Sequence, residues 1–190
     1  MLREETLPTK GATTATPDLS DVIPKIAYEI CGLSPGPAAS LRRGPLAGAG
    51  AAAFWKLTAD YVPNEVRKNE EGWAALIQAI AILTPKGRDP NKKPAHDRRL
   101  PMGTALYKAN FSELRLARLL SATSELRRDL AIRACRRLAT AGQNRFDLVT
   151  LAHFVLFGHD KTDRRIARHY YRADATAKRD SQDKETSADA

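Results

Sequence analysis

The stretch SELRRDLAIRACRRLAT, residues 124–140, has the spacing of an amphipathic helix and decides the fold class. At about 100° per residue, one broad arc collects the apolar side chains, which we expect to face a core. These side chains are Leu126, Leu130, Ala131, Ala134, Cys135 and Leu138. The opposite arc carries Arg133, Arg136 and Arg137, which lie within about a third of a turn of one another. The stretch therefore predicts a helix with one buried face and one cationic face.

The same spacing continues through the rest of the chain. Apolar residues recur every three or four positions, and no stretch alternates for the length of a strand. Asp147 and Ser124 are expected to cap helices, while Gly142 and Gly158 stand just past helix ends. The sequence thus predicts an all-α fold, a single compact bundle of about eight or nine helices. The predicted helices cover residues 20–31, 37–43, 49–59, 70–83, 102–109, 112–121, 124–140, 147–157 and 162–172.

Composition divides the chain into three parts. Residues 1–18 are rich in Thr, Pro and Gly, and residues 173–190 are rich in Asp, Lys, Ser and Thr. Because such segments bury little apolar surface, we expect a flexible N-terminal segment, a helical domain over 19–172 and a flexible acidic tail. Within the domain, PKGRDPNKKPAHDRRLP at 85–101 is predicted to be a mobile, exposed basic loop.

The positive charge is concentrated in the predicted domain. The chain has 31 Lys and Arg against 22 Asp and Glu, which gives a net charge of +9 and a pI of about 9.8. Residues 1–18 carry −1 and residues 173–190 carry −2, so residues 19–172 carry +12. A basic folded surface attracts polyanions such as nucleic acid or an anionic membrane.

Arginines recur close together on neighbouring predicted helices. A solvated face with weak i,i+4 ion pairs would explain one such helix, but few acids oppose the repeated set. The planar fork of arginine binds two phosphate oxygens at once, so the pattern predicts a surface that holds nucleic-acid backbone. Besides Arg133, Arg136 and Arg137, the set comprises Arg42, Arg43, Arg115, Arg118, Arg127, Arg128, Arg164, Arg165 and Arg168.

Several classes of protein are not indicated. Cys31 and Cys135 are far apart and show no metal-type spacing, which fits a reducing compartment. The longest apolar stretch, residues 74–83, is too short to span a bilayer, so we expect a cytoplasmic protein without a membrane partner. No metalloprotease, nucleophile-elbow, phosphate-loop, dinucleotide or deaminase motif occurs, and we expect no catalysis, no metal and no cofactor.

Histidines and aromatic residues give no further site. His96, His153, His159 and His169 are spaced so as to suggest no shared site, and a structural role is expected for each. The larger aromatic residues stand at helical spacing among apolar neighbours, so we expect core packing rather than base stacking. These aromatic residues are Phe54, Trp55, Trp73, Tyr170 and Tyr171.

Several segments, in this order, resemble the CasB family, the small subunit of the type I-E CRISPR Cascade complex. The resemblance lies in the succession of segments and extends over about residues 20–172. The segments are GPAASLRRG at 36–44, the basic loop at 86–99, the Gly-x-x-Leu start at Gly103 to Leu106, SELRLARLLSA at 112–122, RRLATAG at 136–142, FDLVTLAHFVLFG at 146–158 and IARHYYR at 166–172. The chain departs at Leu148, Phe157 and Ile166, where the family often has tryptophan, and at Thr104, where it often has arginine.

The resemblance implies a non-catalytic helical subunit that lines the path of DNA during R-loop formation. The implied partners are guide RNA, target DNA, a second copy of the chain, and the backbone and large subunits of Cascade. Sequence would be read by the guide, while protein holds backbone. Carried over position by position, the candidate nucleic-acid contacts are Arg42, Arg43, Lys86, Arg88, Lys92, Lys93, Arg115, Arg118, Arg136 and Arg137.

Two other functions compete with this one. A sequence-specific DNA-binding regulator would use residues 147–157 and 162–172 as a helix-turn-helix pair, although the apolar character of 147–157 argues against it. An enzyme would be built around His153 or His159, and only the presence of titratable groups supports it.

Overall fold

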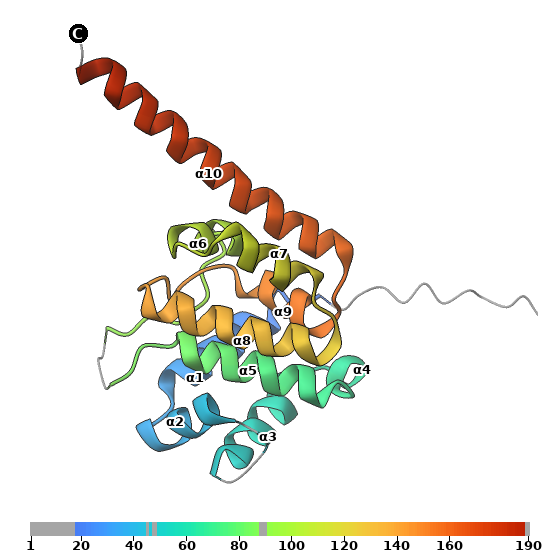
Figure 1. The fold of residues 1–190 in the computed structure, drawn as a ribbon. Coiled ribbons are helices and arrows are strands. Elements are labelled where there is room, and N and C mark those ends of the chain that lie inside the picture. The colour runs from blue at the N-terminus through green and yellow to red at the C-terminus, as the bar shows by residue number, and fades with distance from the viewer. Residues whose placement is uncertain (1–17, 45, 47–48, 88–90, 189–190) are drawn as a thin grey trace, which may run out of the picture.

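The computed structural model describes residues 18–44, 46, 49–87 and 91–188, and the ribbon in Figure 1 consists of helices. The all-α prediction is confirmed, and every predicted helix is present. The single-turn α4 was not predicted, and the one extended pairing in the described residues is a bridge between His96 and Phe146. The helices are α1 (Val22–Gly32), α2 (Pro35–Arg43), α3 (Ala49–Tyr61), α4 (Asn64–Arg67), α5 (Glu70–Leu83), α6 (Met102–Lys108), α7 (Glu113–Ser121), α8 (Ser124–Thr140), α9 (Leu148–Leu156) and α10 (Asp160–Ala188).

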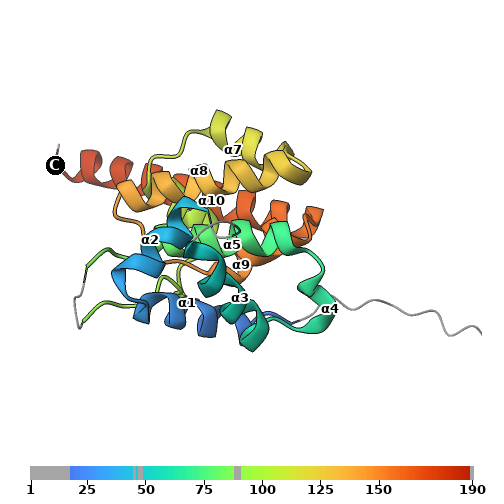
Figure 2. The same cartoon turned by 90° about the horizontal axis from the view of Figure 1, so that it is seen from below.

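Helix α5 is the centre of the core. Ten of its fourteen residues are buried, and it packs against α1, α2, α3, α8 and α9. Figure 2 shows α7 and α8 on one side of α5 and α1 on the other. At its start, the side chain of Asn69 accepts a hydrogen bond from the Gly72 amide and donates one to the Leu156 carbonyl. The longest apolar stretch is therefore a buried core helix, capped by a polar side chain that also ties it to α9.

The other cap positions fit the sequence pattern with one exception. Asp147 caps α9 through its carboxylate, which accepts from the Val149 amide at 3.1 Å. Gly142 and Gly158 follow α8 and α9 with positive φ angles of 73° and 62°. The predicted Ser124 cap is wrong, because Ser124 is the first residue of α8, and the side chain of Thr123 before it makes no capping hydrogen bond.

Helix α10 runs along α6 and extends beyond the body of the molecule (Figure 1). The sequence predicted a helix that ends at residue 172 and a flexible acidic tail, but α10 continues to Ala188. Residues 173–188 contain no Gly or Pro, and Lys178 pairs with Asp174 one turn earlier at 2.8 Å. The predicted flexible N-terminal segment lies outside the described residues except for Asp18.

The loop at 85–101 is irregular, as predicted, but its second half is fixed to the body. Ala95 is buried, and its carbonyl accepts from the Phe146 amide at 3.2 Å. The Asp97 amide donates to the Phe146 carbonyl at 2.9 Å, and the Asp147 amide donates to the Leu100 carbonyl at 2.8 Å. Backbone hydrogen bonds to residues 146–147 therefore tie residues 95–100 to the body, contrary to the prediction of a wholly mobile loop, whereas Lys93, Arg98 and Arg99 are exposed as predicted.

The buried face of α8 is rotated from the predicted arc near the helix start. Arg127 is only 7% exposed, whereas Leu126 is 50% exposed. Position 127 lies on the same face as Ala131, Ala134 and Leu138, and the arginine can occupy it because Asp163 neutralises its charge. Four of the six predicted core positions, residues 131, 134, 135 and 138, are buried as expected.

The prediction that the large aromatic residues pack in the core is confirmed for three of the five residues and wrong for two. Phe54, Trp73 and Tyr170 are buried in the core, whereas Trp55 and Tyr171 are about half exposed. Two of the positions at which the family often has tryptophan, Leu148 and Ile166, are buried. Those two differences are therefore substitutions within the core.

The crossing of α6 and α10 requires a glycine at position 103. A Cβ atom there would lie 2.1 Å from the Ile166 carbonyl oxygen and 2.7 Å from the Tyr170 amide nitrogen. We expect Gly103→Ala to lower the free energy of unfolding by about 1–3 kcal/mol or more, because backbone atoms of α10 would have to move. Gly36→Ala in α2 is the control, since no atom outside the local backbone lies within 4 Å of its Cβ position. Equal denaturant midpoints for Gly103→Ala and the unchanged chain would contradict the close crossing.

His96 links the loop to the start of α9 and gives the fold a pH dependence. Its Nδ1 accepts a hydrogen bond from the Leu148 amide at 3.3 Å, which requires a neutral ring. Burial lowers the pKa of His96 below its ordinary value, so the unfolded chain takes up the proton first as the pH falls. The free energy of unfolding should therefore decrease from about pH 7 toward pH 5.

Urea unfolding across this range tests the His96 prediction. The pKa of His153 and that of His169 are also lowered by burial, so these residues add the same sign of dependence. His96→Gln should consequently remove only part of the decrease. A variant whose stability falls as steeply as that of the unchanged chain would show that His96 does not contribute.

Candidate nucleic-acid interface

A groove between α7 and α8 collects four arginines. Its volume is about 360 Å³, and apolar side chains of Phe111, Leu119, Leu130 and Ala134 also line it. Arg115 and Arg118 are one turn apart on α7, and Arg133 and Arg137 are one turn apart on α8. The helical spacing of each pair, i to i+3 and i to i+4, places both members on the same edge of the groove. The result is an apolar floor with a cationic rim.

The positive charges of these four guanidinium groups are not balanced by nearby carboxylates of the described chain. No carboxylate of the described chain lies within salt-bridge distance of them, and no acidic residue lines the groove. All four are exposed, and within the described chain one hydrogen bond involves their guanidinium groups, from Arg137 Nε to the Ala109 carbonyl at 3.4 Å. Their remaining donors can therefore turn to an anionic ligand such as a phosphate.

The other predicted site residues are dispersed. Arg136 is exposed on α8 beside the groove, and Arg43 is exposed on α2, where it donates to Ser40 Oγ at 3.2 Å. Lys86 and Lys93 are exposed, and Lys92 is half-buried. Arg88 lies outside the described residues. The structure thus brings Arg115, Arg118 and Arg137 together in one groove, and none of the other predicted contacts that the structure describes lines it.

Arg42 has a structural role. Its Nε donates to the Ala81 carbonyl at 2.8 Å and its Nη2 donates to the Thr84 carbonyl at 3.1 Å. These carbonyls belong to the C-terminal end of α5, which also carries the negative end of the helix dipole. Burial lowers the pKa of Arg42 from its ordinary value. Because its fork is filled by carbonyls, Arg42 is poorly placed to hold a phosphate.

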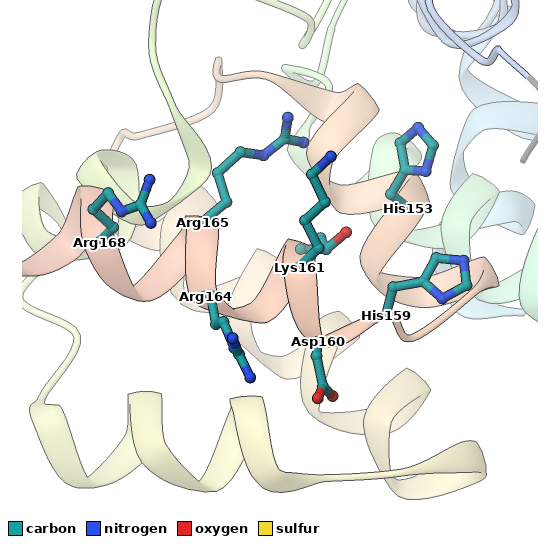
Figure 3. Close-up of a pocket in the computed structure, with 8 residues that line it drawn as sticks. His153, His159, Asp160, Lys161, Arg164, Arg165 and Arg168 are labelled. Carbon is teal, nitrogen blue, oxygen red and sulfur yellow. The ribbon is translucent and has the colours of Figure 1, made fainter.

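A second cationic hollow lies where α9 meets the start of α10 (Figure 3). Its volume is about 960 Å³. The sequence grouped its three arginines with the basic residues but named none of them as a site residue, and the histidine spacing suggested no shared site. That expectation is wrong for His153 and His159, which the turn between α9 and α10 brings to one pocket. The lining residues are His153, His159, Asp160, Lys161, Thr162, Arg164, Arg165 and Arg168.

A buried ion pair connects the groove helix α8 to the pocket helix α10. Arg127 donates from Nη1 and Nη2 to the two carboxylate oxygens of Asp163, both at 3.0 Å. Its Nε donates to the Ala122 carbonyl at 2.8 Å, and its guanidinium lies 4.6 Å above the ring of Phe154. Arg127, which the sequence counted among the exposed bases, is therefore a buried structural residue.

Neither a cluster of potential metal ligands nor a membrane-spanning helix occurs in the described residues. No group of three or more His, Cys, Asp or Glu that could hold a metal ion occurs among them. Across the same residues, no helix combines the length and the apolar character needed to cross a membrane.

The fold and the two hollows define a class of protein. It is a small all-helical protein in which two concave surfaces are lined by several arginines or by arginine and lysine. The chain belongs to the family described as CRISPR-associated protein Cse2, whose model matches residues 38–171, and it is therefore a subunit of the type I-E CRISPR Cascade complex. No curated protein and no solved structure matches the chain.

The family assignment confirms the resemblance seen in the sequence. It also decides between the Cascade subunit and the DNA-binding regulator, in favour of the subunit. The packing agrees, since seven of the nine residues of α9 are buried in the core. The match runs from within α2 to the first part of α10, and so includes both the groove and the pocket.

Proposed function

We propose that this subunit is non-catalytic and stabilises the R-loop by holding nucleic-acid backbone in the groove between α7 and α8. The observation that carries the proposal is the convergence of four uncompensated arginines on one groove. Base pairing with the guide would select the target, while these arginines would contact phosphates irrespective of sequence. A subunit that only holds nucleic-acid backbone needs no catalytic residues.

The groove also suggests how the backbone would be held. Each guanidinium can form two parallel hydrogen bonds with one phosphate, and the rim presents two such groups on each helix. The apolar floor gives the arginine stems a surface to pack on, so the charged ends are held with less loss of side-chain freedom. Arg115, Arg118, Arg133 and Arg137 are therefore the principal contacts in this proposal.

The remaining predicted contacts stay in the proposal with lesser roles. Arg43, Arg136, Lys86 and Lys93 are exposed and free of carboxylate partners within salt-bridge distance in the described chain. The proposed partners are guide RNA, target DNA, a second copy of the chain, and the backbone and large Cascade subunits, in the cytoplasm and without a membrane.

Salt dependence of nucleic-acid binding tests the groove. Replacing Arg115 or Arg118 with Ala should weaken binding to an RNA–DNA hybrid or a duplex equally for unrelated sequences. Each lost contact should reduce the slope of log affinity against log salt by about one unit. Lys56→Ala is the matched control, because Lys56 is an exposed base on α3, away from the groove. Unchanged affinity and slope in an Arg115→Ala/Arg118→Ala double variant would exclude the groove as the contact surface.

Co-purification tests the assembly. A tagged full chain expressed with the other Cascade subunits and a guide should recover that guide RNA together with several Cas proteins. Asp163→Lys, which places a second charge of the same sign beside Arg127, should reduce recovery through loss of folded protein. Recovery of the chain alone, with its folding verified, would contradict the proposed partners.

A further inference from the structure

We propose that the pocket at the start of α10 binds unpaired nucleotides, with phosphates on Lys161, Arg165 and Arg168 and one base stacked on His159. The inference rests on the proposed function in assuming a nucleic-acid ligand, but it uses a different surface and different residues. A single strand of DNA or RNA carries the required chemistry.

The cations form a regular stripe on one face of α10. Positions 161, 165 and 168 are separated by four and three residues, which places their side chains in line. Figure 3 shows Lys161 and Arg165 pointing to the same side as His153, while Arg164 and Asp160 point to the other side of the helix. Arg172, four residues after Arg168, extends the stripe and is exposed. The stripe thus leads from the pocket along the helix, as a track for a backbone would.

Two of the nearby carboxylates, Asp147 and Asp163, already accept hydrogen bonds within the fold. Asp163 is bound to Arg127 through both oxygens. Asp147 accepts from the Val149 amide and from the Thr150 hydroxyl at the start of α9. Arg127 neutralises Asp163, and Asp160, which also lines the pocket, points to the other side of the helix, so no ion pair to a described carboxylate occupies the stripe.

Arg165 is held in place within the pocket. Its Nη2 donates to Thr150 Oγ1 at 2.8 Å, and that hydroxyl in turn donates to the carboxylate of Asp147. This chain of bonds fixes the guanidinium through one of its nitrogens and leaves the other donors available. A positioned cation loses less freedom on binding a phosphate than a free one does.

His159 provides a planar surface. Its ring lies nearly parallel to that of Phe157, with an interplanar angle of 13° and centroids 5.8 Å apart. Phe157 also lies against the ring of His153, with centroids 5.5 Å apart, whereas His159 is exposed. One face of His159 is therefore supported, and the other is open to a ligand with a flat apolar surface. Aromatic side chains next to cations are the usual means by which proteins bind single strands.

The shape of the site favours unpaired nucleotides over a duplex. Within a duplex, each base is covered on both faces by its neighbours, so only its edges can meet a protein. An unpaired base can turn its face to His159 while the adjoining phosphates reach the stripe. The volume of about 960 Å³ lies in the range of pockets that enclose ligands of nucleotide size.

Binding of short oligonucleotides to the full chain tests the phosphate contacts. The probes are single-stranded DNA, single-stranded RNA and a DNA duplex of one sequence, each titrated at several salt concentrations. Lys161→Ala/Arg168→Ala should reduce the salt slope for single strands by about 0.7 per lost contact and should leave the duplex nearly unaffected. Arg179→Ala is the matched control, an exposed base farther along the same helix. Tighter binding of the DNA or of the RNA strand would identify the source of the ligand.

Stacking gives an independent readout. His159→Ala should weaken binding of the single strands roughly 5- to 100-fold, and His159→Phe should restore most of the affinity. A fluorescent base analogue in the strand should be quenched by the unchanged chain and by His159→Phe, but less by His159→Ala. Quenching equal in all three proteins would overturn the stacking contact.

The outcomes separate the two proposals. If the groove variants weaken binding and the pocket variants change neither affinity nor slope for any probe, the pocket inference fails and the proposed function stands. If neither set of variants has an effect, both fail. An equal loss for single strands and duplex in Lys161→Ala/Arg168→Ala would mean that the stripe is a general cationic surface, which also overturns the inference.

Discussion

The pairing of Arg127 with Asp163 is the constraint on which the arrangement of the cationic surfaces depends. Both side chains are largely buried, with 9% and 14% exposed, and the two charges meet through two parallel hydrogen bonds. A buried charge is costly without its partner, so the two helices that carry them must keep one relative position. Gly158, with a φ of 62°, forms the turn between the two helices that contribute to this packing, and its Cα lies beside the Arg127 guanidinium. The groove edge on α8 and the stripe on α10 are thereby fixed to each other.

A second contact sets the direction of α10. The pair at Asp163 holds its start, and the close crossing at Gly103 holds it one to two turns later through the backbone of Ile166 and Tyr170. Tyr170 adds a hydrogen bond from its hydroxyl to the Phe111 carbonyl, which lies just before α7. Because these two contacts hold the first part of α10, the later residues of the helix need no packing against the core to keep its direction. That explains why its polar continuation can leave the body as a helix.

The sequence predicts the positions of most helices well. It predicts poorly which charged side chains take part in tertiary contacts. Periodicity places α5 and most of the buried face of α8 correctly, because it reflects local geometry and burial. It misplaces Leu126 and Arg127, since only the distant Asp163 makes a buried arginine acceptable at that position. It also misses the anchoring of residues 95–100, which depends on backbone hydrogen bonds to residues 146–147 that no side-chain pattern predicts. The pocket that contains His153 and His159 likewise depends on the path of the turn between α9 and α10, which the sequence pattern does not predict.

The arginines of this chain divide by what fills the guanidinium fork. In Arg42 the fork is taken by carbonyls at the end of α5, and in Arg127 by a carbonyl and a carboxylate. In Arg115, Arg118 and Arg133 no such partner is present within the described chain, so the donors remain for a ligand. Because some of these arginines are already bonded within the protein, the net charge of +12 over residues 19–172 overstates the number of cationic groups that a polyanion can contact on one surface. Affinity should follow the number of uncommitted guanidinium groups on one surface, because counterion release counts phosphates contacted and not total protein charge.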